Sequence, residues 1–143
     1  MPPSDFSFDE SLPTVLAEVR RVQSDIKDGL QAHGFGERDM FHIELAMEEA
    51  LVNAMKHGNQ LDSDKFVRLQ YTITPEFFDV RIEDQGAGFN PDDVPDPTMP
   101  ENLERACGRG LYMIRSFMNE VVYHGRGNIV TMRKQKSPPD ADE

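Results

Sequence analysis

The spacing of apolar residues changes from helical to strand-like part-way along the chain, and this change most constrains the fold. From residue 11 to residue 57, apolar side chains recur at steps of three and four, which is typical of amphipathic helices. From residue 66 to residue 83 they alternate with polar side chains, which is typical of strands with one buried face. Two helices followed by a strand pair predict a layered α/β fold.

The helical part divides into two segments at the sequence HGFG. We predict a first helix that begins at Ser11, a good N-cap residue, with Pro13 in its first turn. A second helix is predicted from Arg38 to His57, closed by Gly58. The apolar positions of the first helix are Leu12, Val15, Leu16, Val19, Val22, Ile26 and Leu30.

The strand-like part predicts an antiparallel hairpin that turns at Pro75-Glu76. A loop from Gly86 to Gly108, a helix over 111–120 and two short strands over 121–124 and 128–134 follow. The sequence FSF near the N-terminus could add another strand. We therefore expect an α/β, two-layer sandwich, with helices on one face of a mixed, mostly antiparallel sheet.

The composition indicates one domain over residues 1–136, because 143 residues suffice for a single core. Residues 137–143 are proline-rich and acidic, so we expect a disordered tail. A formal net charge of -11 disfavours direct binding of nucleic acid. No apolar run is long enough for a membrane span, no secretory signal is visible, and a single cysteine, Cys107, fits a cytoplasmic location.

Three polar residues stand four apart in the second predicted helix: Glu49, Asn53 and His57. This spacing places them along one side of a helix, on an arc that apolar residues flank. Asn53 could bind Mg²⁺ through its carbonyl oxygen, Glu49 could accept a proton, and His57 with Lys56 could contact phosphate. The alternative is that Asn53 and His57 are buried polar groups and that Glu49 pairs with an arginine.

The sequence IEDQGAGF follows the hairpin and continues its alternation, so Asp84 should face inward at the end of the strand. An inward carboxylate needs a donor, which we do not expect the neighbouring residues to supply, and the exocyclic amine of adenine would serve. Gly86 and Gly88 would allow close approach of a flat ligand and positive φ angles. The alternative is a strand-ending turn with a capping aspartate.

A third glycine-containing segment, GRGL, comprises Gly108, Arg109, Gly110 and Leu111 and precedes a predicted helix. The amides of a helix N-terminus bind anionic groups, and Arg109 could meet a phosphate or remain solvated. A second GRG at residues 125–127 is interpreted as a hairpin turn. Cys107 is interpreted as a small turn residue, since nothing near it in the sequence guarantees a lowered thiol pKa.

Taken together, EALVNAMKHG, DQGAGF and GRGL resemble the N, G1 and G2 boxes of the GHKL ATPase/kinase superfamily. The resemblance extends from about Ser11 to Lys136. The stretch PTMPENLERACGRGLYMIRSFMNEV resembles most the small bacterial serine/threonine kinases that act as anti-sigma factors. The resemblance implies a Bergerat ATP-binding fold, with ATP and Mg²⁺ as cofactors.

The resemblance also implies roles for individual residues. Glu49 would be the general base, Asn53 the Mg²⁺ ligand, and Asp84 with Gly88 the adenine contact. Residues 108–111 would lie at the phosphate end of the lid. Asn128 stands where the family usually has a threonine that helps to hold adenine. It is polar and on the same face as Val130 and Met132, so that contact would survive in altered form.

The implied activity is phosphorylation of a serine or threonine on an anti-anti-sigma factor, combined with sequestration of a sigma factor by a homodimer. Two alternatives are an ATP-binding regulatory module without catalysis and a detached histidine-kinase-like catalytic domain. A self-contained sensor histidine kinase is not expected, because one helix precedes the N box and no phosphoacceptor helix pair is present.

Overall fold

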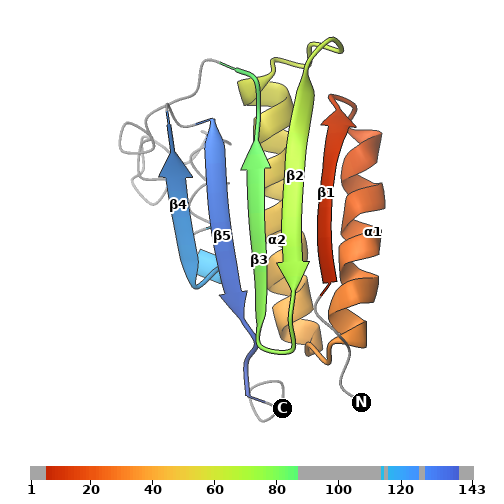
Figure 1. The fold of residues 1–143 in the computed structure, drawn as a ribbon, viewed down its shortest axis with the longest axis vertical. Coiled ribbons are helices and arrows are strands. Elements are labelled where there is room, and N and C mark those ends of the chain that lie inside the picture. Colours follow the sequence, from red (N-terminus) through yellow and green to blue (C-terminus); the bar gives the residue numbers. More distant parts are fainter. Residues whose placement is uncertain (1–5, 87–113, 115, 126–127, 139–143) are drawn as a thin grey trace, which may run out of the picture.

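The computed structural model describes residues 6–86, 114, 116–125 and 128–138, which form helices on one side of a five-stranded sheet. The strand order is β1-β2-β3-β5-β4, and every described pairing is antiparallel (Figure 1). The elements are β1 (Phe6–Pro13), α1 (Ala17–Ala32), α2 (Glu37–Val52), the π-helical segment η1 (Asn53–Gly58), β2 (Phe66–Ile73), β3 (Phe77–Glu83), β4 (Glu120–His124) and β5 (Ile129–Gln135).

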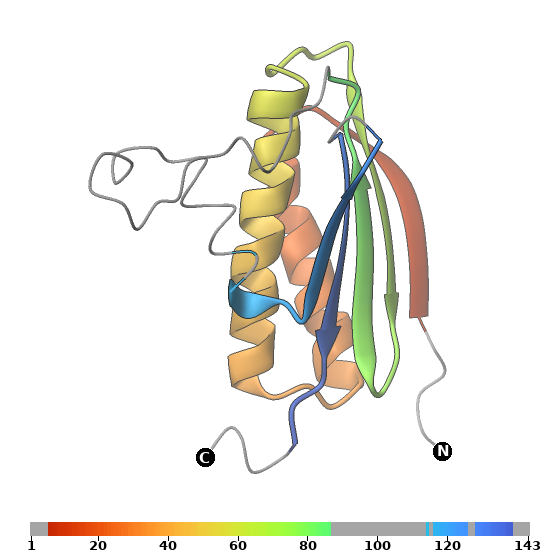
Figure 2. The same cartoon turned by 90° about the vertical axis from the view of Figure 1, so that its left-hand side faces the viewer.

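The two helices cover one face of the sheet and leave the other face open (Figure 2). The core lies between these layers, because the inward positions of the strands are apolar and alternate with polar outward positions. The largest fully buried side chains are Phe78, Leu12, Leu30, Ile43, Met47, Leu51, Met55, Leu69, Ile73, Ile82, Ile114 and Val22. The predicted two-layer α/β fold is confirmed, and the described sheet is antiparallel throughout rather than mixed.

The predicted start of the first helix is wrong. Ser11 and Pro13 belong to β1, and α1 begins at Ala17. Leu12 is buried because it is an inward residue of β1, paired with Val67 of β2. Val15 and Leu16 are 46% and 44% exposed, so these apolar residues matched a helical spacing by coincidence. The strand expected at FSF is therefore confirmed and is longer than predicted.

The predicted hairpin and the two C-terminal strands are confirmed as β2–β3 and β4–β5. The helix predicted over 111–120 is too long at its end, because Glu120 already belongs to β4. Among the described residues of this stretch, 114, 116 and 117 are helical. Ser137, which we assigned to the tail, is held by Asp39 through its backbone N–H (2.7 Å) and its hydroxyl (2.7 Å).

The second helix changes to a wider π-helical turn at Asn53, which the sequence analysis did not foresee. The backbone N–H of Asn59 bonds the carbonyl of Ala54 at 2.8 Å, a step of five residues. On an unbroken α-helix, Asn59 would lie about five turns beyond Phe41 and on the same side. Phe41 is 57% exposed whereas Asn59 is 0% exposed, so the wide turn brings Asn59 round to the protein interior.

None of the helices in the described ranges is both long enough and apolar enough to cross a lipid bilayer.

Candidate functional site

A small pocket lies where the end of the second helix meets the ends of β3 and β5. It is lined by Ala50, Asn53, Ala54, His57, Gly58, Ile82, Asp84, Tyr123, Asn128 and Val130. Its volume of about 70 Å³ is enough for the edge of a flat ring and not for a complete nucleotide. Four residues singled out from the sequence therefore meet in one place, although 75 positions separate the first from the last: Asn53, His57, Asp84 and Asn128.

Asp84 lies at the inner wall of this pocket, one residue beyond β3, and is 9% exposed. Its burial continues the inward alternation of Phe78, Val80 and Ile82, as the sequence predicted. One carboxylate oxygen, Oδ1, accepts a hydrogen bond of 2.8 Å from the backbone N–H of Gly86. The expectation that no local donor reaches this carboxylate is therefore wrong.

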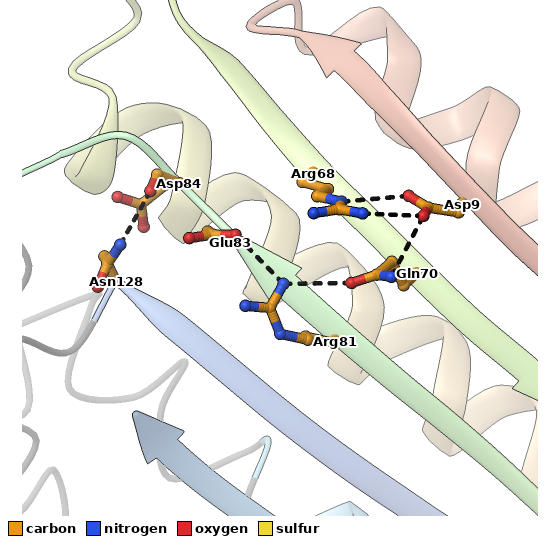
Figure 3. Close-up of polar contacts among 7 residues, drawn as sticks. All are labelled: Asp9, Arg68, Gln70, Arg81, Glu83, Asp84 and Asn128. Carbon is orange, nitrogen blue, oxygen red and sulfur yellow. Dashed lines mark hydrogen bonds and ion pairs between the residues drawn. The ribbon is translucent and has the colours of Figure 1, made fainter. Parts of the chain in front are cut away.

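Asn128 fixes Asp84 from the neighbouring strand end (Figure 3). The Asn128 side-chain Nδ2 donates to the Asp84 carbonyl oxygen at 3.2 Å, and the Asp84 backbone N–H donates to the Asn128 carbonyl at 2.9 Å. Asn128 is 8% exposed and shares the inward face with Val130, as predicted. Its amide nitrogen holds the backbone that carries Asp84, in addition to lining the pocket.

Gly58 and Gly86 lie against one another at the floor of the site. A Cβ atom added to Gly86 would overlap the carbonyl group of Gly58, and one added to Gly58 would overlap the carboxylate of Asp84. Gly86 is not among the glycines with positive φ, which in the described part of the chain are Gly34 and Gly125. The predicted need for glycine is thus explained by close backbone packing, and the predicted positive φ at Gly86 is wrong.

Asn53 and His57 both face the pocket from η1. Neither side chain has a hydrogen bond or an ion pair with another residue in the described ranges. Asn53 is half-buried and His57 is exposed. The alternative that these two residues are buried polar groups satisfied within the protein therefore does not fit the described structure.

Glu49 lies one turn before Asn53 but does not line the pocket. Burial raises the pKa of the Glu49 carboxyl above its ordinary value, and the neighbouring charge of Glu48 raises it further. No described arginine pairs with Glu49, whereas Glu44 and Glu48 are exposed on the solvent side. A carboxylate whose pKa moves toward neutrality is better suited to accept a proton near pH 7.

The remaining predicted site residues, Gly88, Gly108, Arg109, Gly110 and Leu111, lie outside the described residues. Within the described ranges, His, Cys, Asp and Glu side chains form no cluster of three or more that could hold a metal ion. Two further residues were not predicted from the sequence: Tyr123, which lines the pocket from β4, and the buried Asn59 directly after η1. Nothing in the local sequence distinguishes Tyr123 from an ordinary strand residue.

A larger hollow, of about 710 Å³, crosses the open face of the sheet, and the charged side chains in it and beside it are bonded to their neighbours. Arg68 Nη2 pairs with Asp9 Oδ2 at 3.0 Å, and Gln70 donates to the same oxygen at 3.2 Å (Figure 3). Arg81 Nη1 donates to Gln70 Oε1 and to Glu83 Oε1, each at 3.2 Å. Because these groups satisfy each other in an open hollow, the smaller pocket at Asp84 is the better candidate site despite its size.

The fold and this pocket define an α/β sandwich with a polar site at the junction of a helix end and a strand end. The model of the histidine kinase-like ATPase domain matches residues 12–134, so the chain belongs to this family. The predicted membership of the GHKL superfamily is thereby confirmed.

Two curated relatives are similar to the chain in sequence. It is 27% identical over 120 residues to the serine-protein kinase RsbW of Listeria monocytogenes serovar 1/2a, covering 77% of this chain and 74% of that protein. It is 28% identical over 103 residues to the anti-sigma F factor of Clostridium perfringens, covering 68% and 73%. The chain is thus related to anti-sigma factor kinases.

A solved structure supports the fold. It contains the RsbU and RsbW domains of a Mycobacterium tuberculosis protein and matches with a TM-score of 0.64 at 17% sequence identity. The match covers 95% of this chain but only 34% of the solved chain, so this chain spans about a third of that protein.

Proposed function

We propose that the protein is an ATP-dependent protein serine/threonine kinase that acts as an anti-sigma factor. Its substrate would be a serine or threonine of an anti-anti-sigma factor, and it would also sequester a sigma factor. The observation that carries the proposal is the pocket in which Asn53, Asp84 and Asn128 meet, in a member of the histidine kinase-like ATPase family. The related Listeria protein is named a serine-protein kinase, which supports this choice of activity.

The pocket suits the edge of adenine. Asp84 presents a carboxylate at its inner wall, and an adenine amine is a donor of the kind that a carboxylate accepts. The apolar side chains of Ile82 and Val130 line the same pocket and provide contacts for the faces of a flat ring. Since the pocket holds only a ring edge, the ribose and phosphates would lie outside it, and His57 would contact a phosphate, as would the GRGL segment by the family resemblance.

Asn53 would hold Mg²⁺ through its side-chain oxygen, since Mg²⁺ prefers oxygen ligands and is bound in many sites by few protein groups plus phosphates and waters. The absence of an acidic cluster in the described ranges is compatible with such a site, because phosphate oxygens would supply the remaining ligands. When bound, the ion would neutralise the charge of the transferred phosphoryl group.

In the proposed reaction, the hydroxyl oxygen of the acceptor serine forms a bond to the γ-phosphorus while the bond from that phosphorus to the β,γ-bridging oxygen breaks. ADP leaves, and the hydroxyl proton passes to Glu49. The raised pKa of Glu49 suits this role, since it brings the base closer to the pH at which it operates. Catalysis of this kind depends mainly on positioning and charge neutralisation.

The assembly would be a cytoplasmic homodimer that binds proteins and neither nucleic acid nor membrane. A net charge of -11 supports protein partners with basic surfaces over phosphate backbones. β1 is an edge strand, since it pairs only with β2 among the described strands, and with the open face beside it this edge offers a surface for a second copy.

The test is incubation with ATP labelled at the γ-phosphate, Mg²⁺ and proteins captured from an extract of the native cells. The proposal expects acid-stable label on a serine or threonine of a small captured protein, with loss of that label in Glu49→Ala. Glu44→Ala, an exposed glutamate of the same helix, should retain it. Nucleotide binding without transfer would instead support a regulatory module, and acid-labile phosphohistidine would support a detached histidine-kinase-like domain.

A further inference from the structure

Asn59 is the first residue after η1, and every polar atom of its side chain is bonded inside the protein. It is 0% exposed. Its Nδ2 donates to Thr14 Oγ1 and to the Phe66 carbonyl, each at 3.1 Å. Its Oδ1 accepts from the backbone N–H of Gln85 at 2.7 Å. The side chain thus joins segments that follow β1, begin β2 and follow β3.

Two further hydrogen bonds close this network. Thr14 Oγ1 donates to the Lys65 carbonyl at 2.6 Å, and Gln85 Oε1 accepts from the backbone N–H of Phe66 at 2.6 Å. Gln85, in the turn after β3, is therefore held through both its backbone and its side chain. The contact from Asn59 binds the N–H of the peptide group that directly follows Asp84, and Asn128 Nδ2 binds the carbonyl oxygen of the same peptide group from the other side.

The end of η1 and the turn after β3 also contact each other through their backbones. Gly58, which precedes Asn59, packs on Gly86 and on the Asp84 carboxylate so closely that no Cβ fits at either glycine. Residues 58 and 59 therefore hold residues 84–86 in place as one unit. Within this unit the Gly86 N–H binds Asp84 Oδ1, so a shift of the turn would turn the carboxylate as well.

We infer that Asn59 is a positioning residue for base recognition: by holding the Gln85 peptide it aims the Asp84 carboxylate at the base in the pocket. The inference rests on the proposed nucleotide site, and it predicts a selective effect. Removing the amide should loosen Asp84 and leave the apolar walls of the pocket in place. Affinity should then fall for a base with an exocyclic amine and remain for a base without one.

ADP and IDP provide that comparison, because hypoxanthine carries a carbonyl oxygen where adenine carries the amine. Isothermal calorimetry on the wild type with Mg²⁺ should show a preference for ADP of about ten-fold or more, as expected for a hydrogen bond to a charged group. In Asn59→Ala the preference should fall below about three-fold, with the IDP dissociation constant within about two-fold of wild type. The preference is a ratio, so a general loss of stability does not change it.

Thr14→Val is the matched control. It removes the bonds from Asn59 to Thr14 and from Thr14 to Lys65 and leaves the bond between Asn59 and Gln85 intact. It should be less stable than wild type and keep the full preference for ADP. An Asn59→Ala protein that keeps the preference, or that loses ADP and IDP affinity equally, overturns the inference.

Two outcomes separate this inference from the proposed function. Wild-type protein that binds neither nucleotide contradicts the proposed function itself. If Asn59→Ala does not fold, amide hydrogen exchange of the wild type decides. The Gln85 amide should be protected despite its position in a turn, with protection raised by ADP more than by IDP. Unprotected exchange at Gln85, or equal protection by both nucleotides, overturns the inference.

Discussion

Gly86 lies directly on the carbonyl group of Gly58, and this contact joins the end of the second helix to the turn that carries Asp84. Gly86→Ala should therefore push the two segments apart, since its Cβ would overlap backbone atoms that have no side-chain freedom. We expect a loss of stability of about 1–3 kcal/mol, as for other overpacked interiors. We also expect a fall in ADP affinity of about ten-fold or more, measured by calorimetry.

Gly29→Ala is the control for this substitution. Its added Cβ would meet the Cδ1 atom of Ile73, the end of a side chain that can rotate away, at 2.7 Å. Gly29 lies in α1, away from the pocket, so the ADP affinity of this variant should equal that of wild type within about two-fold. Equal loss of affinity in both variants would show that the contact between Gly58 and Gly86 has no special role.

Asp39 anchors the chain after β5. It is 1% exposed and accepts two hydrogen bonds from Ser137, while Lys134 Nζ lies 3.9 Å away. Burial lowers the pKa of Lys134, the charge of Asp39 opposes this, and Arg38 lowers the pKa further. Asp39→Ala would leave the Lys134 ammonium without its counter-charge, and we expect a loss of about 3 kcal/mol in the free energy of unfolding by urea.

Ser137→Ala separates the charge from the hydrogen bonds at Asp39. It removes only the hydroxyl and keeps the backbone N–H, so it should cost about 1 kcal/mol. Comparable losses in Asp39→Ala and Ser137→Ala would contradict the assignment of the larger part of the effect to the buried charge pair.

The sequence was sufficient to predict the layers of this fold, since the alternation in β2 and β3 is a local signal that burial in the sheet preserves. It was not sufficient at β1. Leu12, Val15 and Leu16 fit a helix by spacing, and only pairing with β2, a contact distant in sequence, shows that Leu12 belongs to a strand. Periodicity cannot detect such non-local pairing.

The site was predicted in part for a similar reason. Asp84 and Asn128 could be placed on inward faces because strands have a fixed period of two. Asn59 could not, because the wide turn of η1 changes the direction of the residues that follow it. The burial of Asn59 depends on three segments distant in sequence, so no local pattern indicates it.

Tyr71 offers a test of burial at the sheet. Burial is the main cause that raises the pKa of its phenol to about 12. Its stabilising contribution is therefore complete below the ordinary pKa of 10.0 and is lost as the pH rises through about 12. Ultraviolet titration of phenolate should show one late-titrating tyrosine that disappears in Tyr71→Phe. A Tyr71 that titrates near pH 10 in the folded protein would contradict this assignment.

Glu49 should cost the protein stability at the pH where it would act as a base. Its pKa is raised by burial and by Glu48, so the stability that the protonated form contributes is complete below the ordinary pKa of 4.5 and is lost as the pH rises through the folded pKa. Glu49→Gln keeps the shape without the charge. Its Tm should therefore exceed that of wild type at pH 8, by on the order of 2 °C because solvent screens this half-buried group, and should match it at pH 4. The same variant should lose about 100-fold or more of any phosphotransfer rate, since a neutral amide cannot accept the proton. A Tm difference that is independent of pH would show that the effect of the substitution is not electrostatic.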